Sequence, residues 1–270
     1  MVGNYIVIPA KTNSNRLPGK LLFNVCGKPL IQHTWENCIQ VKDISGVFIA
    51  SSDEKILRAC ESFGANIIYI PEATRTGTDC VVAASKKIEG KNNIVNVQGE
   101  WAIFNPLDIN ILIRSLYRDN KPLVSSLFYR AKRNCYSKKP SFVKVVLKDN
   151  DPNLDGFDAL YFSRCRIPHK SSNFNCHVGI YAFNHAFCDK YKQIKVPDII
   201  SLSSENLEQL EWLQRNIPIK MFEAHRSNSG YNPFGVDTRR DFRRYVKMYK
   251  EINGYKRSFW ESLYFWEWSD

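Results

Sequence analysis

The stretch "YIVIPAKTNSNRLPGK", Tyr5–Lys20, joins an apolar run to a loop that contains two prolines, one glycine and three cations. The β-branched and aromatic start of the stretch, Tyr5–Ile8, predicts a buried strand. A helix is expected soon after the loop, from about Pro29 to Ile39, because apolar residues recur there at helical spacing behind a proline suited to a first helical position. The chain therefore opens with a strand, an irregular cationic loop and a helix.

The same order of strand and helix repeats through the first half of the chain. One of these helices has a capping residue at its start, Asp53, and a terminating glycine, Gly64. Such alternation predicts an α/β fold in which a mostly parallel, mixed sheet lies between helices. Ligands of these folds bind beyond the carboxyl ends of the strands, where the opening loop lies. The strands are expected at 5–8, 47–50, 66–70 and 93–97, and the helices at 29–39, 53–64 and 79–88.

After a helix that begins with Asn105 and Pro106, the pattern changes to strand-like runs separated by turns. This pattern predicts a small hairpin-rich region over about residues 122–183, in which adjacent strands pair. The runs lie at 123–129, 142–147, 159–164 and 177–183, with a turn at 149–156. The remaining elements are expected as a helix at 205–215, a strand at 219–222 and a helix at 239–249.

The composition favours a protein that binds polyanions. The chain of 270 residues has 38 Lys and Arg against 27 Asp and Glu, which gives a net charge of +11. Nucleic acid, an acidic membrane surface and phosphorylated small molecules all fit that charge. Eight cysteines form no C-x-x-C pair and lie mostly in apolar segments, which predicts a reduced, cytoplasmic protein. No signal-peptide pattern and no run of about 18 apolar residues is found, so membrane insertion is not expected.

The opening loop is suited to holding an anion. Lys11, Arg16 and Lys20 are expected to be exposed and to converge where a strand-to-helix turn presents backbone N–H groups, and a triphosphate fits that charge. The spacing is not that of a Walker loop, and the G-x-G-x-x-G pattern of dinucleotide-binding folds is absent. Charge alone fits a solvated basic loop slightly better than a binding site.

The order of the residues, more than their charge, connects the loop to a known family. The motifs "IPAK", "RLPGK" and "GKPLIQHTWENC" resemble the start of the 3-deoxy-manno-octulosonate cytidylyltransferases, the CMP-Kdo synthetases. The resemblance continues through "ASSDEKI", "TGTD", "IVNVQG", "YFSR", "HVGIYAF", "ENLEQLEWL" and "GVDT". It implies a Rossmann-like nucleotidyltransferase fold, a homodimer formed through the hairpin-rich region, and the transfer of CMP from CTP to the anomeric hydroxyl of an acidic eight-carbon sugar, with release of pyrophosphate.

The resemblance also implies site residues at the matching positions. Arg16 and Lys20 would be catalytic, because fixed cations meet the charge that develops on the triphosphate. Arg164 would take the sugar carboxylate through two parallel hydrogen bonds. Helix capping is the alternative role for Thr76 or Thr78, and His177 taken alone fits a core histidine better. The nucleotide side comprises Ala10, Lys11, Arg16, Lys20, Thr76, Gly77, Thr78, Asp79 and Gln98. The sugar side comprises Arg164, His177, Tyr181, Glu208 and Gln209.

In the family, magnesium lies between two acidic positions, which match Glu100 and Asp237 here. Hard oxygen ligands suit this ion, which would polarise the α-phosphate and acidify the sugar hydroxyl. The family usually reads Q-G-D-E-P, whereas this chain reads "QGEWAI", so the first acid is longer and Trp101 replaces the second. Lys11 and Cys80 stand where the family has arginine. Glu211 does too, and this reversal of charge favours an amino-substituted or otherwise altered relative of Kdo.

These observations predict a cytidylyltransferase domain over residues 1–250 and an aromatic extension over 251–270 that covers a groove on this chain or its dimer mate. A solvated basic face with an apolar stripe is expected on the helix at 239–249. Two alternatives remain, a catalytically decayed paralogue that binds nucleotide or sugar and a basic nucleic-acid-binding protein. The second alternative lacks a recognisable nucleic-acid-binding motif, so no nucleic acid is expected as a partner.

Overall fold

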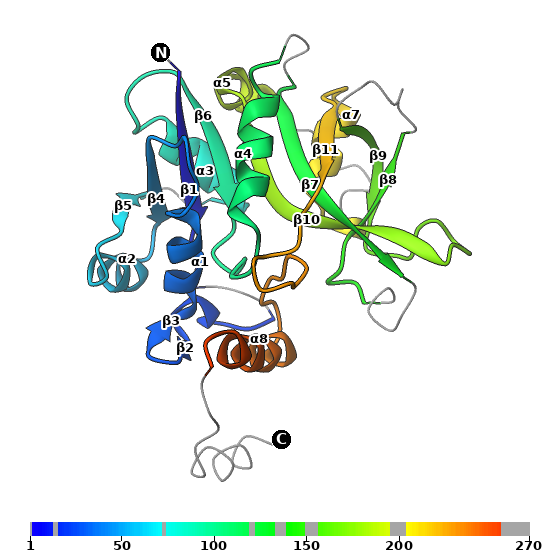
Figure 1. The fold of residues 1–270 in the computed structure, drawn as a ribbon. Helices are drawn as coiled ribbons and strands as arrows, with labels where there is room; N and C mark the ends of the chain where they lie inside the picture. Colours follow the sequence, from blue (N-terminus) through cyan, green and yellow to red (C-terminus); the bar gives the residue numbers. More distant parts are fainter. Residues whose placement is uncertain are drawn as a thin grey trace.

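The computed structural model describes residues 2–12, 16–71, 74–118, 122–132, 139–148, 156–194 and 204–254. Within these ranges one nine-stranded sheet, with the order β5-β4-β1-β6-β10-β7-β11-β9-β8, has helices on both faces (Figure 1). Its strands are β1 (Gly3–Pro9), β4 (Gly46–Ser51), β5 (Asn66–Tyr69), β6 (Asn92–Val97), β7 (Val124–Lys132), β8 (Lys144–Leu147), β9 (Phe157–Ser163), β10 (Asn173–Phe183) and β11 (Ile219–Glu223). The helices are α1 (Leu30–Cys38), α2 (Glu54–Glu61), α3 (Gly77–Ser85), α4 (Pro106–Ser115), α5 (His185–Ile194), α7 (Gln209–Gln214) and α8 (Arg239–Ile252). The predicted α/β class with a mixed sheet is confirmed.

Parallel pairing is concentrated in the part of the sheet formed by the first half of the chain. β1 runs parallel to both β4 and β6, and β4 runs parallel to β5. Beyond β6 the sheet turns antiparallel through β10, which pairs with β6 and with β7. The hairpin-rich region therefore continues the same sheet.

Pairing between adjacent strands, as predicted for the hairpin-rich region, holds for β8 with β9. β7 instead pairs with β10 and with the distant β11, which enters between β7 and β9. In this position the side chains of Ile219 and Met221 of β11 are fully buried, which stabilises the insertion of the strand. The sheet also curls, so that β8 reaches back to pair with β10 at Asn175 and Cys176.

Side chains of β1 alternate between two apolar cores, one on each face of the sheet. Ile6 and Ile8 pack with apolar residues of α1, α2 and α4, whereas Val7 packs with those of α3 and α5. Because successive residues of a strand point to opposite faces, a strand covered on both sides must be apolar throughout. The run Tyr5–Ile8 meets this requirement, and it places the loop after Pro9 at the edge of the sheet.

The starts of α3 and α7 differ from their predicted positions for identifiable reasons. α3 begins at Gly77, because Thr76 and Asp79 form a reciprocal capping box that starts the helix two residues before the predicted position. α7 is shorter than the predicted 205–215, because Asn206 has a φ of 49° in the left-handed region, which a continuous helix excludes.

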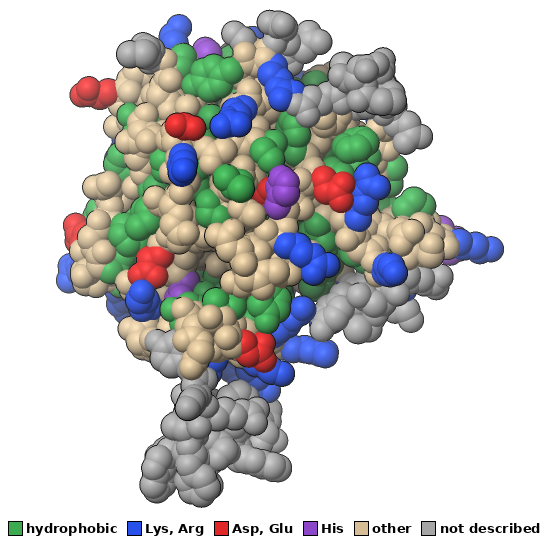
Figure 2. All heavy atoms as spheres, viewed as in Figure 1, with side chains coloured by type: hydrophobic (Ala, Val, Ile, Leu, Met, Phe, Trp, Pro, Cys, Tyr) green, Lys and Arg blue, Asp and Glu red, His purple; other side chains and the backbone are tan. Residues whose placement is uncertain are grey.

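α8 packs its apolar stripe against a third core and leaves its cations at the surface. Tyr245 and Met248 are buried beside Val25, Leu30 and Val236. Figure 2 shows Lys and Arg side chains gathered where α8 lies, as the sequence predicted for a solvated basic face. Most of the aromatic extension, residues 255–270, lies outside the described residues, as does the turn at 149–155. In the described part of the chain no helix has the length and apolar character needed to cross a membrane.

Candidate active site

Three cavities with shared walls lie beyond the carboxyl ends of β1 and β6. The cationic cavity, of about 550 Å³, is lined by Lys11, Arg16 and Lys20. The inner cavity, of about 480 Å³, shares Gly77 and Gln98 with it. A smaller Trp101 cavity, of about 180 Å³, shares Arg16 and Arg164 with the first and His177 with the second. The three spaces together form one site, and they bring most of the predicted residues to it.

The opening loop turns Lys20 inward, contrary to the exposed position predicted for it. Gly19 adopts a left-handed φ of 69° and lets the chain enter a short 3-10 helix, Lys20–Leu22. Leu17 and Leu21 are buried and anchor the loop on either side. The Lys20 side chain is consequently only 6% exposed, and its Nζ lies 3.1 Å from Asp237 Oδ1 and 3.3 Å from Glu100 Oε1.

Asp237 is placed by the residues that flank it in "GVDT". Val236 is fully buried and its N–H donates to the Glu100 carbonyl over 3.0 Å, while Thr238 caps α8. The Asp237 carboxylate therefore points at Lys20 and also lies 2.8 Å from Arg16 Nη2. Burial opposes ionisation of Asp237, but these two cations hold its pKa below the usual value. A stable negative charge results between two cations.

Glu100 and Trp101 lie on a turn that is joined to the Asp237 loop by backbone hydrogen bonds. Ile103 and Phe234 form an antiparallel bridge beside the bond between Glu100 and Val236. The indole of Trp101 packs between two glycines, because a Cβ on Gly179 would stand 3.3 Å from the ring and one on Gly235 would stand 3.5 Å from it. Trp101 thus occupies the space between the acidic loops and β10.

The "TGTD" segment performs the capping role that was the alternative to nucleotide binding, and part of it also lines the site. Asp79 accepts hydrogen bonds from the N–H groups of Arg75 and Thr76 and from the Tyr191 hydroxyl. Gly77 faces Gln98 so closely that a Cβ would lie 2.4 Å from the Gln98 amide nitrogen. Gly77 and Gln98 therefore form the wall between the cationic and inner cavities.

Two of the residues predicted to bind the nucleotide, Ala10 and Lys11, form hydrogen bonds with other parts of the protein. The Ala10 N–H donates to Ala50 over 2.8 Å and its carbonyl accepts from Ser51 Oγ over 2.7 Å, so its peptide groups hold β1 to β4. Ala10 is fully buried. Lys11 Nζ donates to the Thr74 carbonyl and lines the cationic cavity. Lys11 is therefore present at the site, whereas Ala10 supports it from behind.

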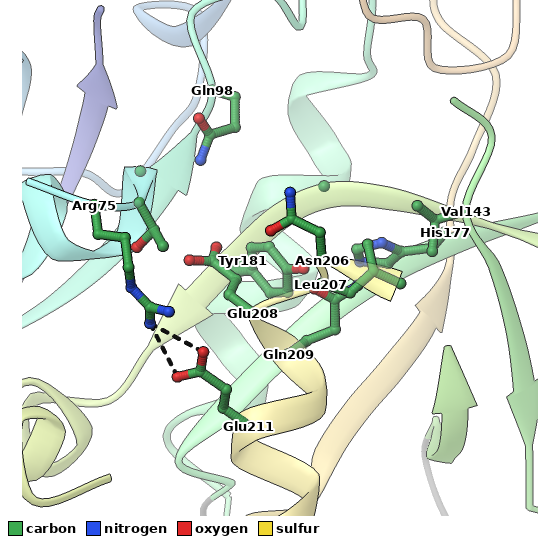
Figure 3. Close-up of a pocket in the computed structure, with 13 residues that line it drawn as sticks. Arg75, Gln98, Val143, His177, Tyr181, Asn206, Leu207, Glu208, Gln209 and Glu211 are labelled. Carbon is green, nitrogen blue, oxygen red and sulfur yellow. Dashed lines mark hydrogen bonds and ion pairs between the residues drawn. The ribbon is translucent and has the colours of Figure 1, made fainter. Parts of the chain in front are cut away.

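The inner cavity contains the predicted sugar residues of β10 and α7 (Figure 3). Burial lowers the pKa of His177 to about 3, so this ring is neutral, and its Nε2 lies 3.0 Å from Ser126 Oγ. Glu208 Oε1 accepts from Thr78 Oγ1 over 2.7 Å, while its buried Oε2 has no hydrogen-bond partner among the described residues. Burial, together with the charges of Asp79 and Glu211, raises the pKa of Glu208. Glu208 therefore lines the cavity with a carboxyl group whose buried second oxygen lacks a hydrogen bond from the described residues.

Arg164 lies at the junction of the cationic and Trp101 cavities and is held by backbone carbonyls. Its Nε donates to Glu205 over 2.6 Å, Nη1 to Pro140 over 3.0 Å and Nη2 to Asn206 over 3.2 Å. A guanidinium has five N–H groups, so donors remain beyond these three described bonds. Arg164 is fixed at the site with capacity to bind an anion.

Sequence reasoning missed Arg75, which no motif singled out. Its Nη2 donates to both carboxylate oxygens of Glu211, over 2.9 Å and 3.2 Å, across the inner cavity. The charge of Glu211 is thus paired, and its reversal relative to the family does not leave a free negative charge for an amino group. The signal for Arg75 was only its place beside "TGTD".

The sheet changes from parallel to antiparallel pairing, a cationic cavity lies at its strand ends, and two acids contact a buried lysine, which together fit a nucleotidyltransferase. The cytidylyltransferase family model matches residues 5–226. The chain belongs to the cytidylyltransferase family. The resemblance stated from the motifs is confirmed by relatives named 3-deoxy-manno-octulosonate cytidylyltransferase, one of which, from Escherichia coli, is 34% identical over 83% of this chain and 89% of its own length.

Other relatives and a solved structure support the same placement. An 8-amino-3,8-dideoxy-manno-octulosonate cytidylyltransferase from Shewanella sediminis is 31% identical over 88% of this chain and 95% of its own length. A solved CMP:2-keto-3-deoxy-manno-octonic acid synthetase complexed with CTP superposes with a TM-score of 0.80 at 32% identity, covering 92% of this chain and 99% of that one. Relatives of this chain therefore include enzymes for both the hydroxyl and the amino form of the sugar.

Proposed function

We propose that this protein transfers CMP from CTP to a 3-deoxy-2-ulosonic acid, Kdo or a modified relative, and releases pyrophosphate. The observation that carries the proposal is the arrangement of Lys11, Arg16 and Lys20 around one cavity that adjoins the inner cavity. Two anionic substrates must meet in the reaction, and the two cavities share a wall at Gly77 and Gln98. CTP in the cationic cavity and the sugar in the inner cavity would bring the reacting atoms together at that wall.

On the nucleotide side, this chain's cations hold the triphosphate and stabilise charge as pyrophosphate leaves. Lys20 is fixed by Glu100 and Asp237, so its ammonium needs little reorganisation when charge develops nearby. Arg16 is about half exposed and anchored at one nitrogen by Asp237, which leaves other N–H groups for phosphate oxygens. Thr76, Gly77, Thr78 and Gln98 would shape the part of the site that receives the cytidine.

Magnesium is the proposed cofactor, with Glu100 and Asp237 as its protein ligands. The donor set fits, because two carboxylates converge on a single cation, the Lys20 ammonium, and magnesium takes one or two carboxylates together with phosphate oxygens and water. When bound, the ion would supply polarisation of the α-phosphate and acidify the sugar hydroxyl. The Asp237 carboxylate is ionised at neutral pH, because Lys20 and Arg16 hold its pKa below the usual value.

On the sugar side, Arg164 would bind the carboxylate while the inner cavity receives the hydroxyl groups. Glu208 lines this cavity, and a sugar hydroxyl that reached its carboxylate would offset the cost of the buried, unsatisfied Oε2. Neutral His177, buried Tyr181 and Gln209 line the same cavity. These groups orient the sugar so that its anomeric hydroxyl faces the shared wall.

A homodimer in the cytoplasm is the proposed assembly and location. Leu160 and Tyr161 of β9 expose 54% and 40% of their surface within the hairpin-rich region, and apolar side chains exposed there fit a contact between copies. Light scattering during gel filtration measures the mass and distinguishes a dimer from a monomer. Cell fractionation tests the location.

The experiment that tests the activity measures pyrophosphate release with CTP, magnesium and a panel of 3-deoxy-2-ulosonic acids. Release that requires both CTP and one of these sugars supports the proposal. Calorimetric titration with duplex DNA is the companion arm, because a general basic surface binds any polyanion with steep dependence on salt. CTP binding without turnover on any sugar would favour the decayed paralogue, and tight DNA binding without CTP binding would favour a nucleic-acid-binding protein.

A further inference from the structure

The ion pair between Arg75 and Glu211 forms part of the lining of the inner cavity. Arg75 lies on the segment before α3, and Glu211 lies in the first turn of α7, 136 residues further along the chain (Figure 3). The Arg75 side chain is 58% exposed, whereas the Glu211 side chain is only 10% exposed. The acid is therefore a largely buried charge and the arginine is the partner that reaches it from the rim.

Two polar contacts tie the start of α7 to the start of α3. Thr78 donates to Glu208 over 2.7 Å, and Arg75 contacts both oxygens of Glu211. The segment of Arg75 also receives Lys11 from the cationic cavity, because Lys11 Nζ donates to the Thr74 carbonyl. The nucleotide side and the sugar side are thus joined through residues 74–78.

The charge of Glu211 is unfavourable for the proposed substrate unless it is paired. Glu211 lies one helical turn from Glu208, and both acids line the cavity that would receive an anionic sugar. Like charges at this spacing repel, and the repulsion also acts on a bound carboxylate. Through its two hydrogen bonds Arg75 cancels the charge of Glu211.

We propose that Arg75 is a positioning residue that sets the charge of the inner cavity, so that the cavity accepts an anionic sugar despite Glu211. The inference rests on the proposed function, because it assumes that the inner cavity receives the sugar acid. It differs from a simple brace between two helices. A brace is broken equally by removal of either partner, whereas charge compensation predicts opposite effects of the two removals.

The experiment compares the parent with Arg75→Met, Glu211→Gln and the double variant, using CTP and 3-deoxy-manno-octulosonate. Arg75→Met should raise the KM for the sugar about 10-fold, because an unpaired buried acid then faces the anion. Glu211→Gln should lower this KM, and the double variant should return it to within about 2-fold of the parent. The KM for CTP should stay unchanged throughout. The exposed pair Arg58 and Glu54, on α2, supplies matched control variants that should change neither constant.

Equal rises in the sugar KM for both single variants, with no recovery in the double variant, would overturn charge compensation. Calorimetric titration of the four proteins with the same sugar gives the order of affinities without turnover. The expected order of affinity is Glu211→Gln highest, the parent and the double variant intermediate, and Arg75→Met lowest. If the four proteins bind the sugar in this order but the parent releases no pyrophosphate, the proposed function fails and the role of Arg75 stands. If the parent releases pyrophosphate and neither the KM values nor the affinities follow this order, only the role of Arg75 fails.

Discussion

Replacement of Lys20 by methionine tests how the site is held together, because this change removes the ammonium and keeps most of the aliphatic chain. In the structure the ammonium lies 3.1 Å from Asp237 and 3.3 Å from Glu100, and the lysine side chain is 6% exposed. Its loss leaves two neighbouring carboxylates without their shared cation. Both the stability of the fold and the activity should fall, in contrast to the small stability effect expected of an exposed loop lysine.

The size of the stability loss follows from burial. Removal of one partner of a fully buried pair costs about 3–5 kcal/mol. Asp237 and Glu100 are 22% and 25% exposed, and Arg16 stays 2.8 Å from Asp237, so water and Arg16 offset part of the loss. We therefore expect a decrease of about 2–3 kcal/mol in the free energy of unfolding, which corresponds to a melting temperature lower by about 5–10 °C.

The loss should depend on pH in a defined direction. The pKa of Asp237 is lower in the folded protein than in the unfolded chain, so its ion pair stabilises the fold above the unfolded pKa of about 4. That stabilisation disappears as the pH falls through the folded pKa. The difference in melting temperature between parent and Lys20→Met should therefore be full at pH 7 and shrink below about pH 4.

The assay is thermal unfolding followed by circular dichroism at pH 7 and at a pH below about 4. Pyrophosphate release is measured at pH 7. Lys28→Met is the matched control, because Lys28 also contacts an acid, Glu36 at 2.7 Å, but is 40% exposed, and its loss should cost less than about 1 kcal/mol. Activity of Lys20→Met should fall about 100-fold or more. A melting temperature equal to that of the parent, or a difference that grows at low pH, would refute the reasoning.

Further substitutions test three separate parts of the site. Gly77→Ala should displace the Gln98 amide, which a Cβ would meet at 2.4 Å, and raise the KM for CTP several-fold. The free energy of unfolding should change by less than about 1 kcal/mol, because alanine favours the helix. An unchanged KM for CTP in turnover assays would count against Gln98 as a nucleotide-binding residue. Arg164→Lys should raise the KM for the sugar and leave that for CTP nearly unchanged, with a melting temperature lower by a few degrees because one ammonium replaces donors to three carbonyls; parallel changes in both constants would contradict the carboxylate role. Glu100→Asp should preserve or raise magnesium-dependent activity, whereas Glu100→Gln and Asp237→Asn should each depress it strongly. If the acid and amide variants behave alike when activity is titrated with magnesium, Glu100 and Asp237 are not its ligands.

The sequence by itself determined the elements whose causes are local. The apolar run Tyr5–Ile8 predicted a strand buried on both faces, and helical spacing predicted the helices that cover it, because each pattern records which face an element buries. The capping boxes are local too, since Thr76 and Thr238 each lie three residues before the acid that completes the box, but they were not used to predict where α3 and α8 begin. The loop cations were also visible, since charge, proline and glycine follow directly from the residues.

Only the tertiary structure decided which distant residues meet. Asp237 reaches Lys20 across 217 positions, and Arg75 reaches Glu211 across 136. Both contacts depend on the strand order, including the entry of β11 between β7 and β9, and that order is fixed by packing of whole faces. A local pattern specifies which face of an element is apolar but not which neighbour covers it. For this reason the inward turn of Lys20 and the pairing of Glu211 emerged only when the sheet was assembled.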